Sequence, residues 1–163
     1  MHKSSYDNMK KFIDKYLDKP GRVADIGSMD INGSYRPLFD ENLWYYAGID
    51  IVEGLNVDIV VRNPYKWKEI KDNSFDVVIS GQTLEHVEKD VDVIEEIRRI
   101  LRPKGLCCII VPSAGGKHMQ HDYRRYTNEG LSNTMRESGF VIIESYMDET
   151  MEWRDVVVIA RKV

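Results

Sequence analysis

The sequence has few cysteines, no long apolar run and no apolar leader among its first residues. Its two cysteines, Cys107 and Cys108, are adjacent within an apolar run, where neighbouring side chains of a strand point to opposite faces. They are therefore expected to be buried thiols in a reducing compartment rather than a disulfide. No apolar run approaches the ~20 residues of a membrane span, and nothing resembles the apolar core of a secretory signal. A cytoplasmic protein without a membrane partner is predicted.

Positive charge is also scarce, because 23 lysines and arginines face 27 aspartates and glutamates and give a formal net charge of -4. Binding to a nucleic-acid backbone needs a surplus of basic side chains, so nucleic acid is not expected as a partner. The four histidines and two cysteines show no metal-ligand spacing, and no metal site is predicted. The length predicts a single domain over residues 1–163, with an N-terminal helix in 1–19 and the core in 21–163.

Short runs rich in valine and isoleucine alternate with helical patterns along the chain. The predicted strands are Arg22–Ile26, Tyr45–Asp50, Val57–Val61, Phe75–Ser80, Leu106–Pro112, Phe140–Tyr146 and Asp155–Ala160. The predicted helices are Tyr6–Leu17, Asp90–Leu101 and Thr127–Glu137, with room for only a short helix at Pro37. Nearly continuous apolar strands separated by helices predict an α/β fold with a mostly parallel, doubly covered sheet.

The connection before the final strand breaks this pattern. Only the eight residues Met147–Arg154 separate the last two strands, whereas a parallel crossover needs a dozen or more. The final strand is therefore predicted to run antiparallel to the strand before it.

Polar segments directly follow several predicted strands, at the edge of the sheet where open α/β folds bind ligands. The first is "GSMDINGS", in which Gly27 and Gly33 let the backbone approach a ligand. Asp50 ends the second strand and is placed to accept hydrogen bonds from the two hydroxyls of a ribose. The alternative for Asp50 is a turn or cap aspartate.

The first of these loops does not suit a dinucleotide. A pyrophosphate needs a glycine-rich turn leading straight into a helix, whereas Ser28, Met29 and Asp30 follow Gly27 here. Asp30 would repel a pyrophosphate. An acidic loop suits a ligand with a positive centre and no phosphate, such as S-adenosylmethionine with its sulfonium and ammonium groups.

Five motifs occur in order: "VADIGSMDINGS", "YAGID", "NSFDVVISGQTLEHV", "EEIRRILRPKGLCCIIVPS" and "HDYRRYTNEGL". Together they resemble the class I S-adenosylmethionine-dependent methyltransferases, specifically the small methyltransferase-11-like group, over Gly21 to Ala160. The resemblance implies a Rossmann-like fold: a seven-stranded, mostly parallel sheet with an antiparallel last strand and helices on both faces. The last-strand direction inferred from spacing agrees with it.

The resemblance also implies roles for individual residues. Asp25, Gly27 and Ser28 match the motif against the methionine part of the cofactor. Asp50, with Ile51 after it, matches the acidic residue that holds the ribose. The region that borders the adenine is matched by Arg62 and Asn63, although Arg62 stands where an acidic residue often occurs. The loop that lines the cofactor and opens towards the acceptor is matched by Gln82, Leu84, Glu85 and His86.

Methyl transfer requires a positioned acceptor and, for a hydroxyl or protonated amine, a general base. His86 and His121 are the predicted bases, and Asp122, Tyr123 and Tyr126 are the predicted acceptor contacts in the segment "GGKHMQHDYRRY". The alternatives are that His86 only braces its loop and that the segment is a charged surface loop.

The predicted function is methyl transfer from S-adenosylmethionine to an oxygen or nitrogen of a small-molecule or sugar-type acceptor. A non-catalytic S-adenosylmethionine-binding partner subunit is the first alternative, since the cofactor residues establish binding but not turnover. A nucleotide-binding oxidoreductase is the second, although it lacks its phosphate loop. Association as a homodimer or with a partner subunit is left open.

Overall fold

The computed structural model of the protein describes residues 2–117 and 119–163. The strands in this part of the chain are β1 (Arg22–Ile26), β2 (Tyr45–Asp50), β3 (Ile59–Val60), β4 (Phe75–Gly81), β5 (Leu101–Pro112), β6 (Phe140–Asp148) and β7 (Asp155–Lys162). The helices are α1 (Lys3–Tyr16), α2 (Asp90–Ile100) and α3 (Asn128–Glu137), with 3-10 turns η1 (Arg36–Leu38) and η2 (Leu84–His86).

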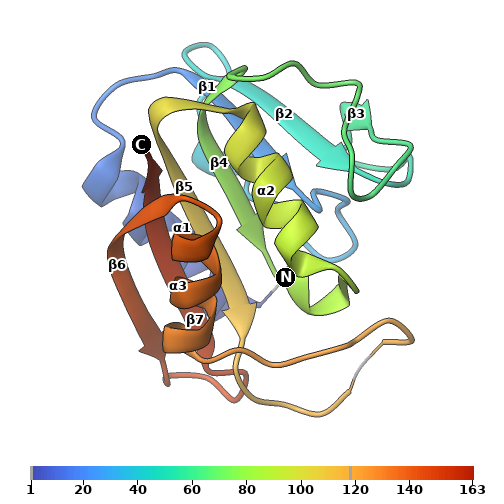
Figure 1. Ribbon diagram of the computed structural model, residues 1–163, viewed down its shortest axis with the longest axis vertical. Coiled ribbons are helices and arrows are strands. Elements are labelled where there is room, and N and C mark those ends of the chain that lie inside the picture. Colours follow the sequence, from blue (N-terminus) through green and yellow to red (C-terminus); the bar gives the residue numbers. More distant parts are fainter. Residues whose placement is uncertain (1, 118) are drawn as a thin grey trace.

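The strands form one seven-stranded sheet in the order β3-β2-β1-β4-β5-β7-β6 (Figure 1). All pairings from β3 to β5 are parallel, whereas β7 lies antiparallel to both β5 and β6. The predicted fold class and the antiparallel last strand are confirmed. The carboxyl ends of β1, β2, β4 and β5 therefore share one edge with the start of β7.

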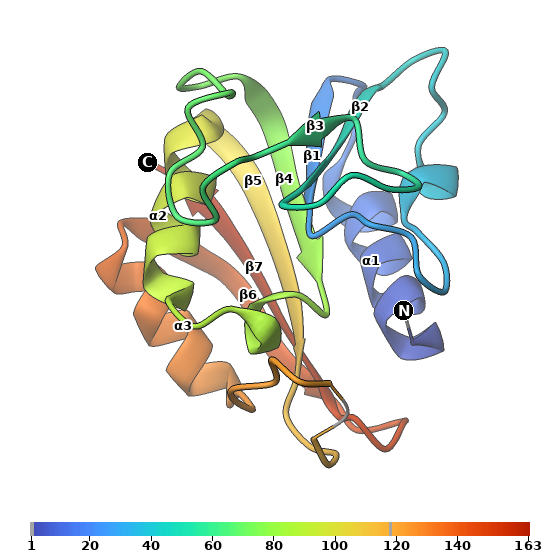
Figure 2. The same cartoon turned by 90° about the vertical axis from the view of Figure 1, so that its right-hand side faces the viewer.

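Helices cover both faces of the sheet, with α1 on one side and α2 and α3 on the other (Figure 2). Alternate residues of each strand enter different clusters: Val23 packs with Phe12 of α1, whereas Ala24 packs with Ile97 of α2. Cys107 and Cys108 divide in the same way and are fully buried free thiols. The prediction that these cysteines point to opposite sides is confirmed.

Helix α1 begins three residues before its predicted start at Tyr6. Ser4 and Ser5 have the polar character of an exposed helix entrance, yet they are 4 % and 0 % exposed. Ser4 donates a hydrogen bond to Asp155 at 2.6 Å, and the hydroxyls of Ser5 and Tyr35 lie 2.5 Å apart. Hydrogen bonds to these distant partners stabilise an additional helical turn before Tyr6, which the apolar pattern does not indicate.

Two strands differ from their predicted extents. β3 is reduced from Val57–Val61 to two residues because Asp58 uses its carboxylate to accept the Gly48 N–H at 2.7 Å. β5 begins at Leu101 rather than Leu106, since Leu101 already pairs with Phe75 before a register shift. The short turn η1 fits the expected short helix at Pro37. Within the described residues the longest helix, α1, has 14 residues, and none is long and apolar enough to cross a membrane.

Candidate active site

The loop after β1 turns sharply at Gly27, whose φ of +74° favours glycine. A Cβ at this position would lie 2.2 Å from the Thr83 hydroxyl oxygen at the end of β4. The Gly27 N–H donates to the carbonyl of Ile49 at 2.9 Å, so the loop bends across the end of β2. Gly27 is therefore required both by its backbone conformation and by its contact with Thr83.

Ser28 ties this loop to the connection after β2. Its hydroxyl donates to the carbonyl of Asn56 at 3.1 Å, and the Asn56 amide donates to the Ser28 carbonyl at 2.8 Å. Ser28 is only 5 % exposed. Its hydroxyl is thus engaged within the protein, and the reciprocal pair fixes the spacing of two loops at the ligand edge.

The carboxylate of Asp50 is held by backbone groups of both loops. Met29 donates its N–H to Oδ2 at 3.0 Å, and Ile51 donates to Oδ1 at 2.7 Å, with Val52 at 3.4 Å from the same oxygen. An ionised carboxylate offers about four lone-pair sites, so Asp50 can still accept a further donor. Its orientation is fixed before any ligand binds.

Asp25, one strand away, is 3 % exposed and accepts a hydrogen bond from the Tyr46 hydroxyl. Burial raises the pKa of Asp25 to about 7, against the lowering effects of the Tyr46 hydroxyl and of Arg36. Tyr46 itself is buried in β2. The predicted contact of Asp25 with the cofactor stays a prediction.

Beyond the end of β2, apolar side chains are left exposed. Ile51 is 57 %, Val52 46 % and Leu55 77 % exposed. Arg62 and Asn63 follow β3 and are also exposed. The Asn63 side-chain oxygen accepts the N–H of Tyr65 at 2.8 Å, which makes Asn63 a turn residue. The edge next to Asp50 therefore presents aliphatic surface.

Gln82, directly after β4, has a φ of +56°, an uncommon conformation for a residue with a side chain. Its amide donates to Asp155 at 2.8 Å, and its N–H donates to Ile110 at 2.8 Å. Backbone strain of this kind persists where the surroundings fix it and is frequent at functional sites. Leu84, two residues on, is fully buried in the core.

The connection between β5 and α3 lies against η2. Three of its residues form hydrogen bonds with residues of η2. Tyr123 donates its N–H to the carbonyl of Glu85 at 2.8 Å, and the Tyr126 hydroxyl donates to that of Leu84 at 3.1 Å. The His86 Nδ1 lies 2.6 Å from the carbonyl of His121. In Figures 1 and 2 this orange connection extends beyond the sheet, beside the red turn between β6 and β7. The Ala114 N–H donates a hydrogen bond to the carbonyl of Trp153 in that turn.

Arg125 holds the same connection together by hydrogen bonds to several of its residues. Its guanidinium makes two hydrogen bonds to the Asp122 carboxylate, at 2.5 and 2.8 Å, and donates to the carbonyls of Ala114, Gly115 and Gly116. The Asp122 side chain is 1 % exposed. Sequence reasoning missed Arg125, because a basic residue three positions after Asp122 is common in surface loops, and its carbonyl partners lie nine to eleven residues away.

The predicted acceptor residues therefore separate into two groups. His121 and Tyr123 are exposed, with the His121 Nδ1 lying 3.2 Å from the Tyr123 hydroxyl. Asp122 is bound by Arg125, and Tyr126 is 9 % exposed with its hydroxyl donating to Leu84 and lying 3.0 Å from Asp90. The first pair faces solvent at the ligand edge, and the second pair holds the connection in place.

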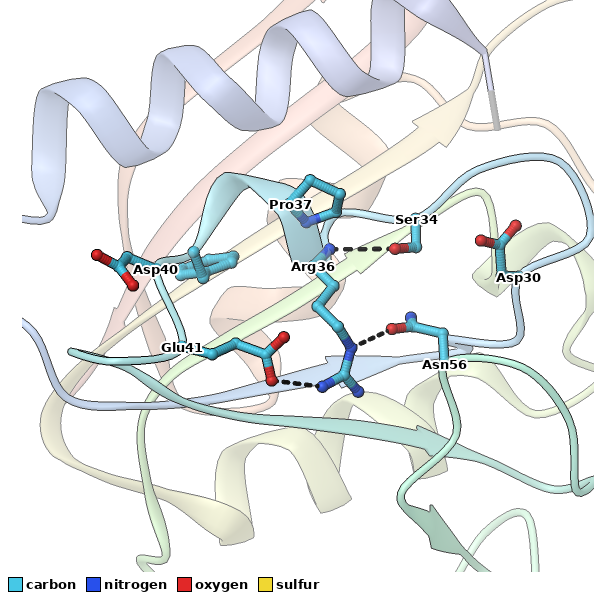
Figure 3. A pocket seen from close by; sticks show the side chains of 8 residues that line it. Asp30, Ser34, Arg36, Pro37, Asp40, Glu41 and Asn56 are labelled. Carbon is cyan, nitrogen blue, oxygen red and sulfur yellow. Dashed lines mark hydrogen bonds and ion pairs between the residues drawn. The ribbon is translucent and has the colours of Figure 1, made fainter.

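A cavity of about 520 Å³ adjoins the other side of the first loop. Figure 3 shows Arg36 extending from η1 between Glu41 and Asn56, which accept its hydrogen bonds at 3.1 and 2.5 Å. The Arg36 guanidinium also lies 4.3 Å from the centre of the Tyr46 ring. The Arg36 contacts therefore support Asn56 and Tyr46, the partners of Ser28 and Asp25.

Residues 24–109 match a family described as "Methyltransferase domain". The chain belongs to this family. The match includes Asp25, Gly27, Asp50 and Gln82 and ends within β5. The methyltransferase is confirmed as a class I, S-adenosylmethionine-dependent member.

Known relatives agree with this assignment. The methyltransferase is 25% identical over 164 residues to phosphoethanolamine N-methyltransferase 2 of Caenorhabditis elegans, covering 86% of this chain but only 37% of that protein. Its fold is similar to that of a Burkholderia thailandensis 1,6-didemethyltoxoflavin-N1-methyltransferase with bound S-adenosylhomocysteine, with a TM-score of 0.79 and 22% identity over 98% of this chain and 79% of that one. A Haloferax volcanii complex between the Trm112 methyltransferase activator and a methyltransferase matches with a TM-score of 0.74 and 15% identity, over 96% and 89% of the two chains.

Proposed function

We propose that this methyltransferase transfers the methyl group of S-adenosylmethionine to an oxygen or nitrogen of a small-molecule acceptor, with sugars among the candidates. The observation that carries the proposal is the edge formed by Gly27 and Asp50. It combines a close backbone approach with an oriented carboxylate and exposed aliphatic side chains. These features fit a nucleoside with a positive centre rather than a pyrophosphate.

Each cofactor residue has a role that follows from its surroundings. Asp50 accepts the ribose hydroxyls, and Ile51 covers the adenine from the edge of β2. The turn of Gly27 and Ser28 presents backbone to the methionine part, with Asp25 supporting it from below. Arg62 and Asn63 border the adenine, and Gln82 forms the opposite wall after β4. The side chain of Leu84 is buried in the core and supports this wall from behind.

The cofactor supplies an activated methyl group on a sulfonium, so the protein mainly has to orient the acceptor, an effect worth roughly 7–11 kcal/mol. His86 is the preferred base. A carbonyl oxygen can only accept, so the hydrogen bond to His121 places the proton of a neutral His86 ring on Nδ1, and Nε2 is the ring nitrogen that accepts a proton when the ring becomes charged. His121 is the second candidate base. Tyr123 contacts the acceptor, whereas Asp122 and Tyr126 hold the connection that covers it.

The name of the Caenorhabditis elegans relative supports nitrogen as the accepting atom. Because the methyltransferase spans little more than a third of that protein, the name does not narrow the proposal beyond an oxygen or nitrogen acceptor. A non-catalytic partner subunit would share the cofactor residues and differ in lacking turnover.

Calorimetric titration with S-adenosylmethionine, and in parallel with NAD, tests the cofactor edge. We expect binding of the first alone and its loss in Asp50→Ala. Asp18→Ala removes the same charge from an exposed residue after α1 and should bind like the wild type. Binding of NAD, or undiminished binding by Asp50→Ala, would overturn the proposed site. Cofactor binding without transfer of labelled methyl to any amine, hydroxyl or sugar offered would instead favour the partner subunit.

A further inference from the structure

Glu85 is a buried carboxyl group with no counterpart in the cofactor proposal. Its side chain is 0 % exposed, and neither of its oxygens has a hydrogen-bond partner among the residues that the structure describes. Buried polar groups without a partner are rare in folded proteins and call for a functional or structural explanation. Glu85 lies in η2, three residues after Gln82 and directly before His86.

A ring nitrogen of the predicted base lies close to this carboxyl group. The His86 Nε2 lies 3.6 Å from the Glu85 Oε1. This distance is too long for a hydrogen bond but within the range of an ion pair. Because Nδ1 is committed to the His121 carbonyl, Nε2 is the nitrogen that gains a proton when His86 becomes charged. That proton would appear facing a carboxyl group.

Other charged groups near Glu85 are already engaged. Arg125 is bound to Asp122 by two hydrogen bonds, and Asp155 accepts hydrogen bonds from Ser4 and Gln82. Burial raises the pKa of Glu85 to about 8, and Asp122 and Asp155 act in the same direction. Arg125 and the Glu85 backbone N–H act in the opposite direction. The His86 ring, 3.6 Å away, is therefore placed to interact with an ionised Glu85.

We propose that Glu85 is a positioning residue for His86, holding its ring and stabilising the imidazolium that forms when the acceptor loses its proton. In this step a lone pair of the acceptor attacks the methyl carbon, and the carbon–sulfur bond breaks with its electrons going to sulfur. The proton of the acceptor moves to His86 Nε2. The positive charge on the ring then lies 3.6 Å from the Glu85 carboxyl group and favours its ionised form, which burial otherwise disfavours.

The inference rests on the proposed function and narrows its acceptor. A proton-accepting pair serves an acceptor whose reacting atom carries a hydrogen, such as a hydroxyl or a primary or secondary amine. A thioether or tertiary amine has no such proton and needs no base. The pair therefore favours the first class.

Nuclear magnetic resonance on the full chain tests the pair without an acceptor or cofactor. The Glu85 carboxyl ¹³C signal and the His86 ring ¹⁵N signals are followed from pH 5 to 9. We expect the Glu85 carboxyl to titrate near pH 8 and the Nε2 signal to show a step at the same pH. Glu85→Gln should abolish that step, and Glu88→Gln, which removes an exposed carboxylate three residues away, should retain it.

A second variant, His86→Asn, tests the pair independently, in case Glu85→Gln does not fold. In His86→Asn the Glu85 carboxyl should titrate at a pH different from that in the wild type, because the facing ring is gone. An identical His86 profile in Glu85→Gln and wild type, or an unchanged Glu85 titration in His86→Asn, would overturn the proposal. Calorimetry with S-adenosylmethionine is independent of this result, so failure of the cofactor site and failure of the pair are distinguishable.

Discussion

The loop after β1 and the connection after β5 lie at the same edge of the sheet but are held by different kinds of contact. Backbone groups fix the first: Gly27 donates to Ile49, and Met29 donates to Asp50. The charged side chain of Arg125 fixes the second through Asp122 and three backbone carbonyls. The proposed cofactor side is thus held largely by the path of the backbone, whereas the proposed acceptor side depends on a few charged side chains.

Each side contains one buried carboxyl group with a raised pKa, about 7 for Asp25 and about 8 for Glu85. Both values lie above those of unfolded carboxyl groups, so the folded state holds protons that the unfolded state releases. The free energy of unfolding should therefore fall as pH rises from about 4.5 towards 8, by at most about 1.4 kcal/mol per pH unit for each group. Urea unfolding at several pH values measures this slope.

Variants of the two carboxyl groups separate their contributions to the pH dependence of the unfolding free energy. Asp25→Asn should flatten the curve up to pH 7, and Glu85→Gln should flatten it up to pH 8. Glu88→Gln should leave the slope unchanged because Glu88 is exposed. A wild-type stability that rises over this range would contradict the assignment.

Substitution of Gly27 should destabilise the loop after β1. Gly27→Ala combines a positive φ with a Cβ 2.2 Å from the Thr83 hydroxyl, and we expect a loss of about 2–4 kcal/mol in unfolding free energy. Gly116→Ala is the matched control, since a Cβ there meets nothing within 4 Å. Similar urea midpoints for the two variants would contradict the close approach at Gly27.

Asp155 connects α1 to the start of the acceptor side. Asp155→Ala removes the acceptor of the Ser4 and Gln82 hydrogen bonds in a fully buried position, and should cost about 2–3 kcal/mol. Hydrogen exchange should show faster opening of the first turn of α1 and of Gln82. Unchanged protection at both places would show that these bonds do not anchor the helix.

The smallest global effect is expected at Arg125. Arg125→Lys keeps the charge but loses the planar group that bonds Asp122 twice, and should change global stability by less than about 1 kcal/mol. Limited proteolysis within residues 113–126 should nevertheless become clearly faster. Equal cleavage of this connection in variant and wild type would contradict its dependence on Arg125.

Sequence reasoning was most successful where the signal is local. Gly27 directly follows a predicted strand and Asp50 ends another, and the helix predicted from Thr127 begins there with the Thr127 side chain accepting the Gly130 N–H. The same reasoning did not predict Arg125 or the early start of α1. The start of α1 depends on folding that brings distant residues together, such as Asp155 beside Ser4, and the role of Arg125 depends on how the connection after β5 folds back on itself.

The partial burial of the acceptor segment could not be predicted for the same reason. Asp122 and Tyr126 lie in a polar segment that is typical of a surface loop. Their side chains are nevertheless buried, because Arg125 binds the Asp122 carboxylate and the Leu84 carbonyl accepts the Tyr126 hydroxyl. Glu85 was visible in the motif "LEHV". Its isolation from hydrogen-bond donors depends on the exact packing around η2, which spacing does not encode.

The position of β7 constrains the order of folding. It follows β6 in the chain but lies between β5 and β6 in the sheet, and its first residue bonds to Ser4 across 151 positions. A nascent chain ending before Asp155 would have neither a neighbour for β6 nor the acceptor that anchors the first turn of α1. Contacts this distant in sequence slow folding. The first turn of α1 and the middle of the sheet are therefore completed only once β7 has joined the sheet.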